Sequence, residues 1–168
     1  MSSIHIADTG VFVAIGRPSN QRYRALRTYA RRNEIVFVVP GRVYDELTAE
    51  DSDLATPPID QVIEEDWATI GEQLDFTNPL VSRVMDGVQR FIASADDRNK
   101  DDIEQADAAL AALAAQHLDT ERATDVYIYT TDIAAGEGAE TVLASEGYGD
   151  SVTFVNAFAL IEDLVDAF

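Results

Sequence analysis

The chain has 168 residues, of which 46% are hydrophobic, and this suits a single domain over residues 1–168 with a buried core. No apolar run is long enough to span a membrane. It contains no cysteine and two histidines, which excludes disulfides, thiolate catalysis and cysteine zinc sites and leaves little for a histidine-rich metal site. The net charge of −19 is extreme, but the core is too well patterned for disorder, so we interpret the acidity as adaptation to high salt in a soluble, cytoplasmic protein.

The first predicted element is a short apolar run from Ile4 to Ala7 that ends in Asp8 and Thr9. Apolar residues on both faces suit a strand in the middle of a parallel sheet, where helices cover both sides. An acid at its end would lie at the carboxyl edge of the sheet, where open α/β proteins bind ligands. Asp8 is therefore a candidate functional residue, although an aspartate that begins a turn explains the same pattern.

The segment between Asp8 and Glu34 contains no acidic residue and carries half of the basic residues of the chain. Asn20 is a suitable cap for a helix that runs to Arg32. The helix and the turn before it carry the candidate contact residues Arg17, Arg22, Arg24 and Arg27. The arginines are interpreted either as a patch that contacts RNA phosphates or a protein partner, or as an ordinary solvated helix face.

Residues 35–39 predict a second buried strand, and Pro40 then suits the first turn of a helix that places Glu46 near the end of that strand. Residues 50–58 are expected to form a loop. Residues 59–74 suggest one or two helices with Trp67 and Ile70 facing inward, and a further helix is expected over 79–92. The polar stretch 94–102 is expected to be a surface turn.

The clearest helical pattern covers residues 102–117, where apolar residues recur at spacings of three and four. Asp107 falls among these apolar positions, where a carboxylate is costly unless it is compensated. It is therefore either a hydrogen-bonded core acid or a metal-binding or catalytic carboxylate. Residues 126–130 predict a third strand followed by Thr131 and Asp132, and a helix over 133–145, a strand over 152–155 and a last helix complete the chain.

Strands that alternate with helices predict an α/β fold with a central parallel sheet of four to five strands and helices on both faces. Asp8 and Asp132 would lie at the ends of two strands, Glu46 just beyond a third, and Asp107 would face inward from a helix. Crowded carboxylates repel each other and would be stabilised by a divalent cation. With thirty-one acidic residues in the chain, some would lie near strand ends by coincidence.

Together these motifs resemble the PIN-domain nucleases, including the VapC-like ribonucleases. The resemblance covers essentially the whole chain and rests on residues 6–9, Glu46, the alanine-rich stretch 106–114 and residues 130–132. It implies a PIN-like fold and an endoribonuclease that depends on Mg²⁺ or Mn²⁺. RNA is the implied substrate. An antitoxin-like protein and a second copy of the chain are the implied partners.

The resemblance also implies roles for individual residues. Asp8, Asp107 and Asp132 would hold the metal, and Glu46 or Asp107 would orient the attacking water. Thr9 and Thr131 would position water or phosphate. Relatives often carry an acid or asparagine two residues after the position of Asp132, but this chain has Ala134, so a second metal site is weakened or Glu137 takes over the role.

Two other classes fit the same pattern. A phosphotransfer receiver also places acids at strand ends around Mg²⁺, but it needs a well-placed lysine, and the only lysine, Lys100, lies in the polar stretch 94–102. A catalytically silent module that binds RNA or protein would use the acids only as surface. Metal titration at high salt separates the silent module from both enzymes.

Overall fold

The computed structural model describes residues 2–41, 44, 58–95 and 105–167. Five strands form one sheet in the order β3-β2-β1-β4-β5, and every neighbouring pair is parallel. The strands are β1 (Ser3–Ala7), β2 (Phe37–Val39), β3 (Ala68–Ile70), β4 (Asp125–Thr130) and β5 (Val152–Asn156). The predicted α/β class with a parallel sheet of four to five strands is confirmed, and the first strand lies in the middle of the sheet.

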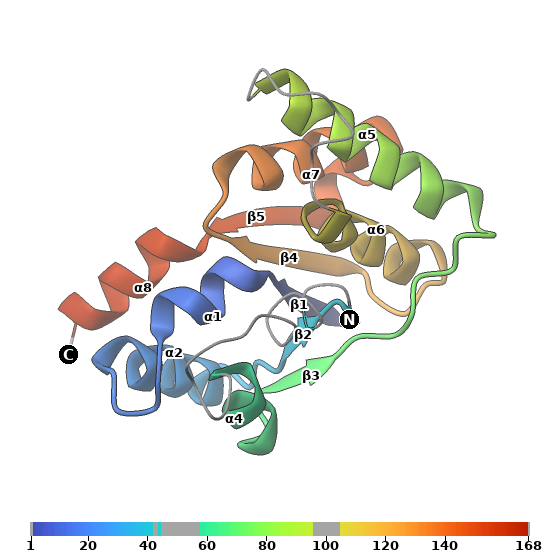
Figure 1. Cartoon of the computed structure of the whole chain (residues 1–168). Helices are drawn as coiled ribbons and strands as arrows, with labels where there is room; N and C mark the ends of the chain where they lie inside the picture. Colours follow the sequence, from blue (N-terminus) through green and yellow to red (C-terminus); the bar gives the residue numbers. More distant parts are fainter. Residues whose placement is uncertain (1, 42–43, 45–57, 96–104, 168) are drawn as a thin grey trace.

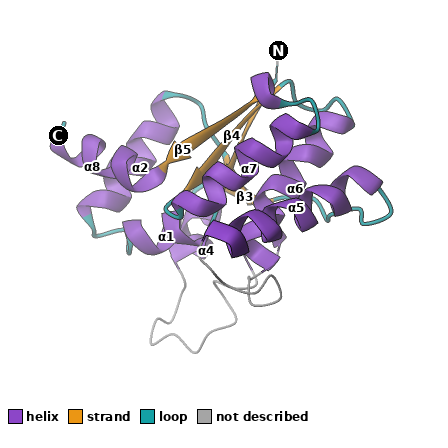
Figure 2. Cartoon of the chain, turned by 90° about the horizontal axis from the view of Figure 1, so that it is seen from above, coloured by secondary structure: helices purple, strands orange, loops and turns teal. Residues whose placement is uncertain are grey.

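Helices cover both faces of this sheet (Figure 1). On one side lie α1 (Thr9–Ile15), α2 (Gln21–Arg32), α4 (Pro58–Glu64) and α8 (Ala157–Asp166). On the other side lie α5 (Pro79–Ala95), α6 (Gln105–Asp119) and α7 (Ile133–Ser145), which contact one another. The view in Figure 2 shows the strands enclosed between these two groups of helices. A short 3₁₀ turn, Gly149–Ser151, precedes β5.

The helix α6 is more deeply buried than the sequence pattern suggests. All eight residues from Ala108 to Ala115 are buried, because the helix packs against β1 and β4 on one side and α5 and α7 on the other. Alanines have no side chain beyond Cβ, so they let the neighbouring elements approach from every direction. A helix that is apolar all round is expected in such a place.

Four helices begin at a capping residue whose side chain accepts a hydrogen bond from the first turn. These residues are Asp8, Asn20, Asp132 and Asn156. Short polar side chains at this position satisfy backbone N–H groups that have no partner within the helix. The cap predicted at Asn20 is confirmed.

The prediction of helix over residues 59–74 was wrong in its second half. The helix α4 ends at Glu64, the chain turns at Asp66 with a φ of 67°, and Ala68–Ile70 form the edge strand β3 beside β2. Ile70, which the helical pattern placed inward, is 45% exposed. Backbone pairing with β2 satisfies the polar groups of this stretch better than another helical turn, and local pattern does not detect such pairing.

Two further differences concern boundaries. Residues 10–15, to which the sequence analysis assigned no element, belong to the helix α1. Residues 94 and 95, expected in a turn, end the helix α5. The helix expected after Pro40, the loop expected at 50–58 and the rest of the polar stretch 94–102 lie almost wholly outside the described residues. Within the described ranges, no helix is long and apolar enough to cross a membrane.

Candidate active site

Asp8 lies at the carboxyl end of β1 and is 6% exposed. Its carboxylate accepts two hydrogen bonds, one from the Gly10 backbone N–H to Oδ1 at 3.0 Å and one from the Thr130 hydroxyl to Oδ2. Gly10 is required here by close approach, because a Cβ at this position would collide with the Thr131 side chain. The first strand therefore ends in a buried acid that is held in one orientation.

Thr130 connects Asp8 to the second strand-end acid. Its Oγ1 donates to Asp8 and accepts a hydrogen bond from the backbone N–H of Asp132 at 3.0 Å. Asp132 in turn caps α7, where its Oδ1 accepts from the Ala135 backbone N–H at 3.2 Å. The neighbouring strands β1 and β4 thus bring the two acids to the same edge of the sheet, where the Thr130 hydroxyl links the Asp8 carboxylate to the backbone of Asp132.

The electrostatic environment of Asp8 favours its neutral form. Burial raises the pKa of Asp8 to about 6, although hydrogen bonds from Thr130 and the backbone oppose the change. The negative charge of Asp132 is a smaller cause of the raised pKa. No arginine, lysine or histidine of the described segments forms an ion pair with either acid. A positive charge placed between them would therefore be strongly favoured.

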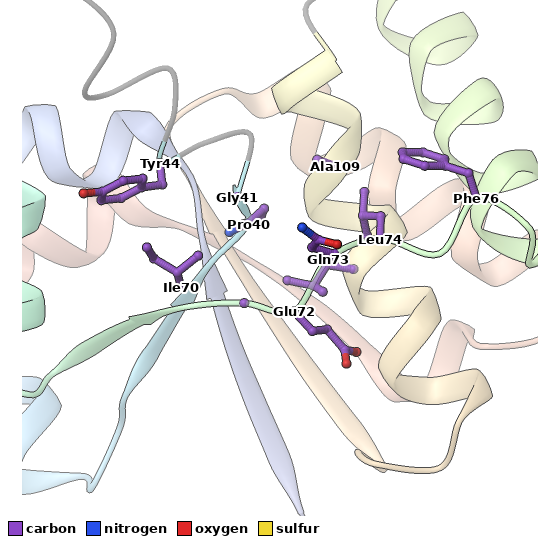
Figure 3. Close-up of a pocket in the computed structure, with 11 residues that line it drawn as sticks. Pro40, Gly41, Tyr44, Ile70, Glu72, Gln73, Leu74, Phe76 and Ala109 are labelled. Atoms are coloured by element: carbon purple, nitrogen blue, oxygen red, sulfur yellow. The ribbon is translucent and has the colours of Figure 1, made fainter.

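The topology brings Asp107 to this edge as well. The helix α6 leads into β4, so its first turn, which contains Asp107, lies at the carboxyl ends of the strands. Ala109, two residues further along, lines a cavity of about 650 Å³ together with Pro40 and Gly71, which follow β2 and β3 (Figure 3). The position of Asp107 in the helix is confirmed, whereas its side chain lies outside the described part of the structure.

The sequence matches the family of halobacterial PIN domains over residues 1–168. The chain belongs to the PIN-domain family. This confirms both the resemblance and the interpretation of the acidity as a halophilic feature. Comparisons with curated proteins and with solved structures found no match. PIN domains are generally nucleases, so membership of the family indicates a nuclease-type function.

Several of the residues expected in a PIN active site are not described at side-chain level. Glu46 lies outside the described residues, and the side chain of Thr9 does too. Among the residues that are described, no group of three or more His, Cys, Asp or Glu side chains is arranged to hold a metal ion. Asp8 and Asp132 are the part of the expected ligand set that the structure shows.

The supporting residues have different positions. Thr131 is half-buried beside Gly10 at the start of the turn into α7. Ala134 is in the first turn of that helix, and Glu137 is exposed to solvent on it. Positions 135, 136, 138 and 139 of the helix are buried, so Glu137 is on its outer side. Its role as a replacement for an acid at 134 stays a prediction.

The predicted arginine contacts divide into two groups. Arg17, Arg22 and Arg24 are exposed, and the Arg22 guanidinium lies 5.9 Å from the centre of the Phe158 ring. Arg27 instead forms an ion pair of 3.0 Å with Glu65 and is 25% exposed. The first group is open to a ligand, whereas Arg27 has an internal partner.

Thr130, which links the two acids, belongs to the motif 130–132, but the sequence predicted no role for it. Thr130 is completely buried and lies on the same face of β4 as the buried Val126 and Ile128. A hydroxyl at an inward position of a strand is a signal that it satisfies a buried polar partner. The motif Thr130–Asp132 drew attention to Thr131 because that residue adjoins the acid in sequence.

Proposed function

We propose that this PIN domain is an endoribonuclease that depends on Mg²⁺ or Mn²⁺ and cleaves single-stranded or structured RNA. The observation that carries the proposal is the pair Asp8 and Asp132, whose carboxylates lie at the ends of adjacent strands without a basic partner among the described side chains. Structural acids normally have such a partner, because burial of an uncompensated charge is costly.

The donor set fits a hard divalent cation. Asp8 would be a direct ligand, and Asp132 a direct or water-mediated one, with Asp107 and Glu46 completing the set. When bound, the metal supplies a nucleophilic water and neutralises the charge that develops on the phosphate. Thr130 fixes the orientation of the Asp8 carboxylate, which is buried at the end of β1.

The cavity beside α6 supports a polymeric substrate. Its lining includes the exposed apolar side chains of Ile70 and Phe76, which are 45% and 51% exposed, and the ring of Tyr44 (Figure 3). Rings and apolar groups of this kind accommodate unstacked nucleobases. One nucleotide next to the cleaved bond would occupy this cavity.

The decisive experiment compares the wild type with Asp8→Asn at molar salt. Asparagine is also a good helix cap, so the substitution removes the charge while α1 keeps its N-terminus. We expect calorimetric binding of Mn²⁺ to weaken greatly and cleavage of single-stranded RNA to fall by about 100-fold or more. The control is Asp163→Asn, an exposed acid on α8, which should change neither. A wild type that binds no divalent ion at millimolar concentration would refute the proposal.

A second variant tests the contribution of Asp107. If Asp107 belongs to the carboxylate cluster, Asp107→Asn relieves repulsion, so the metal-free protein is as stable as before or slightly more stable, and both cleavage and stabilisation by Mn²⁺ are lost. A core acid would instead lose about 1 to 3 kcal/mol of stability with and without metal. Thermal unfolding in chelator and in Mn²⁺ distinguishes the two, and Glu137→Gln measured beside it tests the replacement role.

A catalytically silent binding module is the second candidate. It is favoured by the capping hydrogen bonds of Asp8 and Asp132, which give both acids a structural task, and by Ala134 at a position that is often acidic in the family. This module would bind RNA or a protein partner without metal. Binding that persists in chelator together with absent cleavage in Mn²⁺ would select it.

As an extension of the proposal, the protein acts as the toxin of a toxin–antitoxin pair and forms a homodimer. The exposed Val13 and Phe158 on α1 and α8 support a partner on that side of the molecule. A neighbouring gene for a short protein that binds the domain and suppresses cleavage would support the toxin role. Light scattering at molar salt measures the oligomeric state.

A further inference from the structure

A second cavity, of about 400 Å³, lies on the face of the sheet opposite to Asp8, towards the amino ends of the strands. Because side chains alternate along a strand, His5 and Asp8 point to opposite faces of the sheet. They are separated by about 10 Å along the strand direction. The cavity is therefore distinct from the acidic edge. Its main lining residues are His5, Tyr29, Asn33, Tyr127, Tyr129 and Thr153.

A row of side chains crosses the sheet, and three of its members, His5, Tyr127 and Thr153, line this cavity. Phe37, His5, Tyr127 and Thr153 are in register on four neighbouring strands. The rings of His5 and Tyr127 are stacked, with centroids 4.9 Å apart and planes inclined by 7°. The next position in the row, on the edge strand β5, is the short, exposed Thr153. The stack thus ends in an open slot above Thr153, about one ring spacing from Tyr127.

The rings beside the slot are held in place. Tyr129 forms hydrogen bonds with the His5 Nδ1, at 2.8 Å, and with Tyr29. Burial lowers the pKa of His5, so its ring is neutral at neutral pH and stacks without a charge. The Nδ2 of Asn33 donates a hydrogen bond to the backbone carbonyl of Tyr29 at 2.8 Å. These side chains are therefore already ordered, and the protein would lose little conformational freedom when a ligand ring binds.

The charge of the surroundings suits RNA. None of the lining residues is acidic, although the chain carries 31 Asp and Glu residues. Tyr29 and Asn33 line the cavity from the carboxyl end of α2, which we take as its rim, and the exposed Arg32 follows Tyr29 by three residues and so lies on the same side of the helix. The cavity itself contains no cation, so it suits an uncharged ring, with the phosphate of that nucleotide near the rim.

High salt strengthens this choice of ligand. At molar ionic strength the Debye length is about 3 Å, so contacts between arginine and phosphate contribute little affinity. Stacking of a base on an aromatic ring is largely insensitive to salt. A chain with a net charge of −19 needs such a contribution to hold RNA in the conditions to which its acidity is adapted.

We infer that the slot between Tyr127 and Thr153 binds one unpaired nucleobase of the RNA, stacked on the outer face of Tyr127. The inference rests on the proposed function for its choice of RNA as the source of the base. It adds a contact on the opposite face of the sheet from the acids, so a bound strand would pass around the edge of the sheet formed by β5. Double-stranded RNA has no free base to offer and would not use the slot.

The test measures binding of a labelled single-stranded oligoadenylate in chelator, across a range of high salt concentrations, with adenosine as a second probe. Tyr127→Ala should weaken oligoadenylate binding about tenfold at every salt concentration, without changing the slope of log K against log salt. Thr153→Phe should fill the slot and weaken binding similarly. The matched controls are Tyr127→Phe, which keeps the ring, and Thr153→Val, which keeps the size, and both should bind like the wild type.

The outcomes separate this inference from the nuclease proposal. Wild-type affinity in both Tyr127→Ala and Thr153→Phe, with folding verified by thermal unfolding, overturns the slot even if cleavage depends on Asp8. Binding of adenosine that depends on Tyr127, with binding of oligoadenylate that does not, also overturns it, because the site then serves a free nucleoside. Binding of oligoadenylate that depends on both positions supports the slot, even if the protein cleaves no RNA and the nuclease proposal fails.

Discussion

Two carboxylates in this PIN domain, the buried Asp8 and the half-buried Glu65, have opposite electrostatic environments. Asp8 accepts hydrogen bonds from two neutral groups, the Gly10 N–H and the Thr130 hydroxyl, and the nearby Asp132 repels it. Glu65, in the connection between α4 and β3, accepts from the Tyr23 hydroxyl at 2.6 Å, from the Trp67 indole at 3.2 Å and from the Arg27 guanidinium at 3.0 Å. Among the described side chains, Asp8 therefore lacks a counter-charge, whereas Glu65 has one.

The pKa values of the two acids shift in opposite directions. Burial raises the pKa of Asp8 to about 6. Burial would raise the pKa of Glu65 as well, but hydrogen bonds from Tyr23 and Trp67 and the charge of Arg27 outweigh it, so the pKa is lowered. The difference distinguishes a carboxylate that is compensated within the fold from one that the described side chains leave uncompensated, and it can be tested on each acid separately.

The largest change in stability is expected for Glu65→Ala. The substitution leaves the buried Tyr23 hydroxyl, the Trp67 indole N–H and the Arg27 guanidinium without their shared acceptor. We expect the free energy of unfolding at pH 7 to fall by about 2 to 3 kcal/mol. Urea unfolding at constant molar salt measures it.

The matched control is Glu64→Ala, because Glu64 is the adjacent residue and is exposed. Its effect should stay within about 0.5 kcal/mol. The stabilisation by Glu65 is present above its unfolded pKa and is lost as the pH falls through its lower folded pKa. The difference between the two variants should therefore shrink in acid. Equal effects at pH 7 would show that Glu65 is no structural anchor.

Asp8→Asn should have the opposite and smaller effect in metal-free protein. The pKa of Asp8 is raised from 3.8 to about 6, so its contribution to stability is complete below pH 4 and is lost as the pH rises through 6. The neutral asparagine avoids that loss, which is at most about 3 kcal/mol, but gives up one hydrogen bond worth about 1 kcal/mol. Above pH 6 the variant should be about 1 to 2 kcal/mol more stable than the wild type.

The advantage should vanish near pH 4, where the wild-type carboxyl is itself protonated. Thermal unfolding from pH 4 to pH 8 in chelator and molar salt measures the change, and Asp163→Asn serves as the control because Asp163 is exposed on α8. A variant that is less stable than the wild type at every pH would assign Asp8 to the same structural class as Glu65.

Most of the fold could be predicted from the sequence, because the hydrophobic periods of β1, β4 and α2 agree with their buried faces. The edge strand β3 could not, since it has three residues and pairs only with β2. Its formation depends on a neighbour that lies about thirty residues earlier in the chain. Local propensity contains no information on such a partner.

The strand-end acids could be predicted for the same reason as the sheet, because a parallel sheet places all carboxyl ends at one edge. The link between them through Thr130 could not be read from spacing, since it depends on the register of β1 beside β4. The stacked rings of His5 and Tyr127 depend on that register too. Neither residue belongs to a motif, and they meet only when the strands pair.

The smallest effects on RNA binding and stability are expected for the arginines of α2. These arginines also differ in whether they have a partner within the protein. Arg27 pairs with Glu65, whereas Arg22 and Arg24 are exposed. Arg22→Gln and Arg24→Gln should each reduce the slope of log K against log salt for RNA binding by about one, with stability unchanged.

Arg27→Gln is the comparison that makes this prediction specific, because it removes the same charge from the same helix. It should lower the free energy of unfolding by about 1 kcal/mol through the loss of a partly exposed ion pair, and should leave the salt slope of RNA binding as it is. Fluorescence anisotropy of a labelled RNA over a salt series, beside urea unfolding of the three variants, measures both quantities.

If Arg27→Gln flattens the salt dependence as much as Arg24→Gln does, the ion pair with Glu65 opens in the complex, and Arg27 belongs to the RNA-contacting group after all. If none of the three changes the slope, the arginines of α2 serve only to solvate that surface, and RNA must be held by the acidic edge and the rings of the sheet.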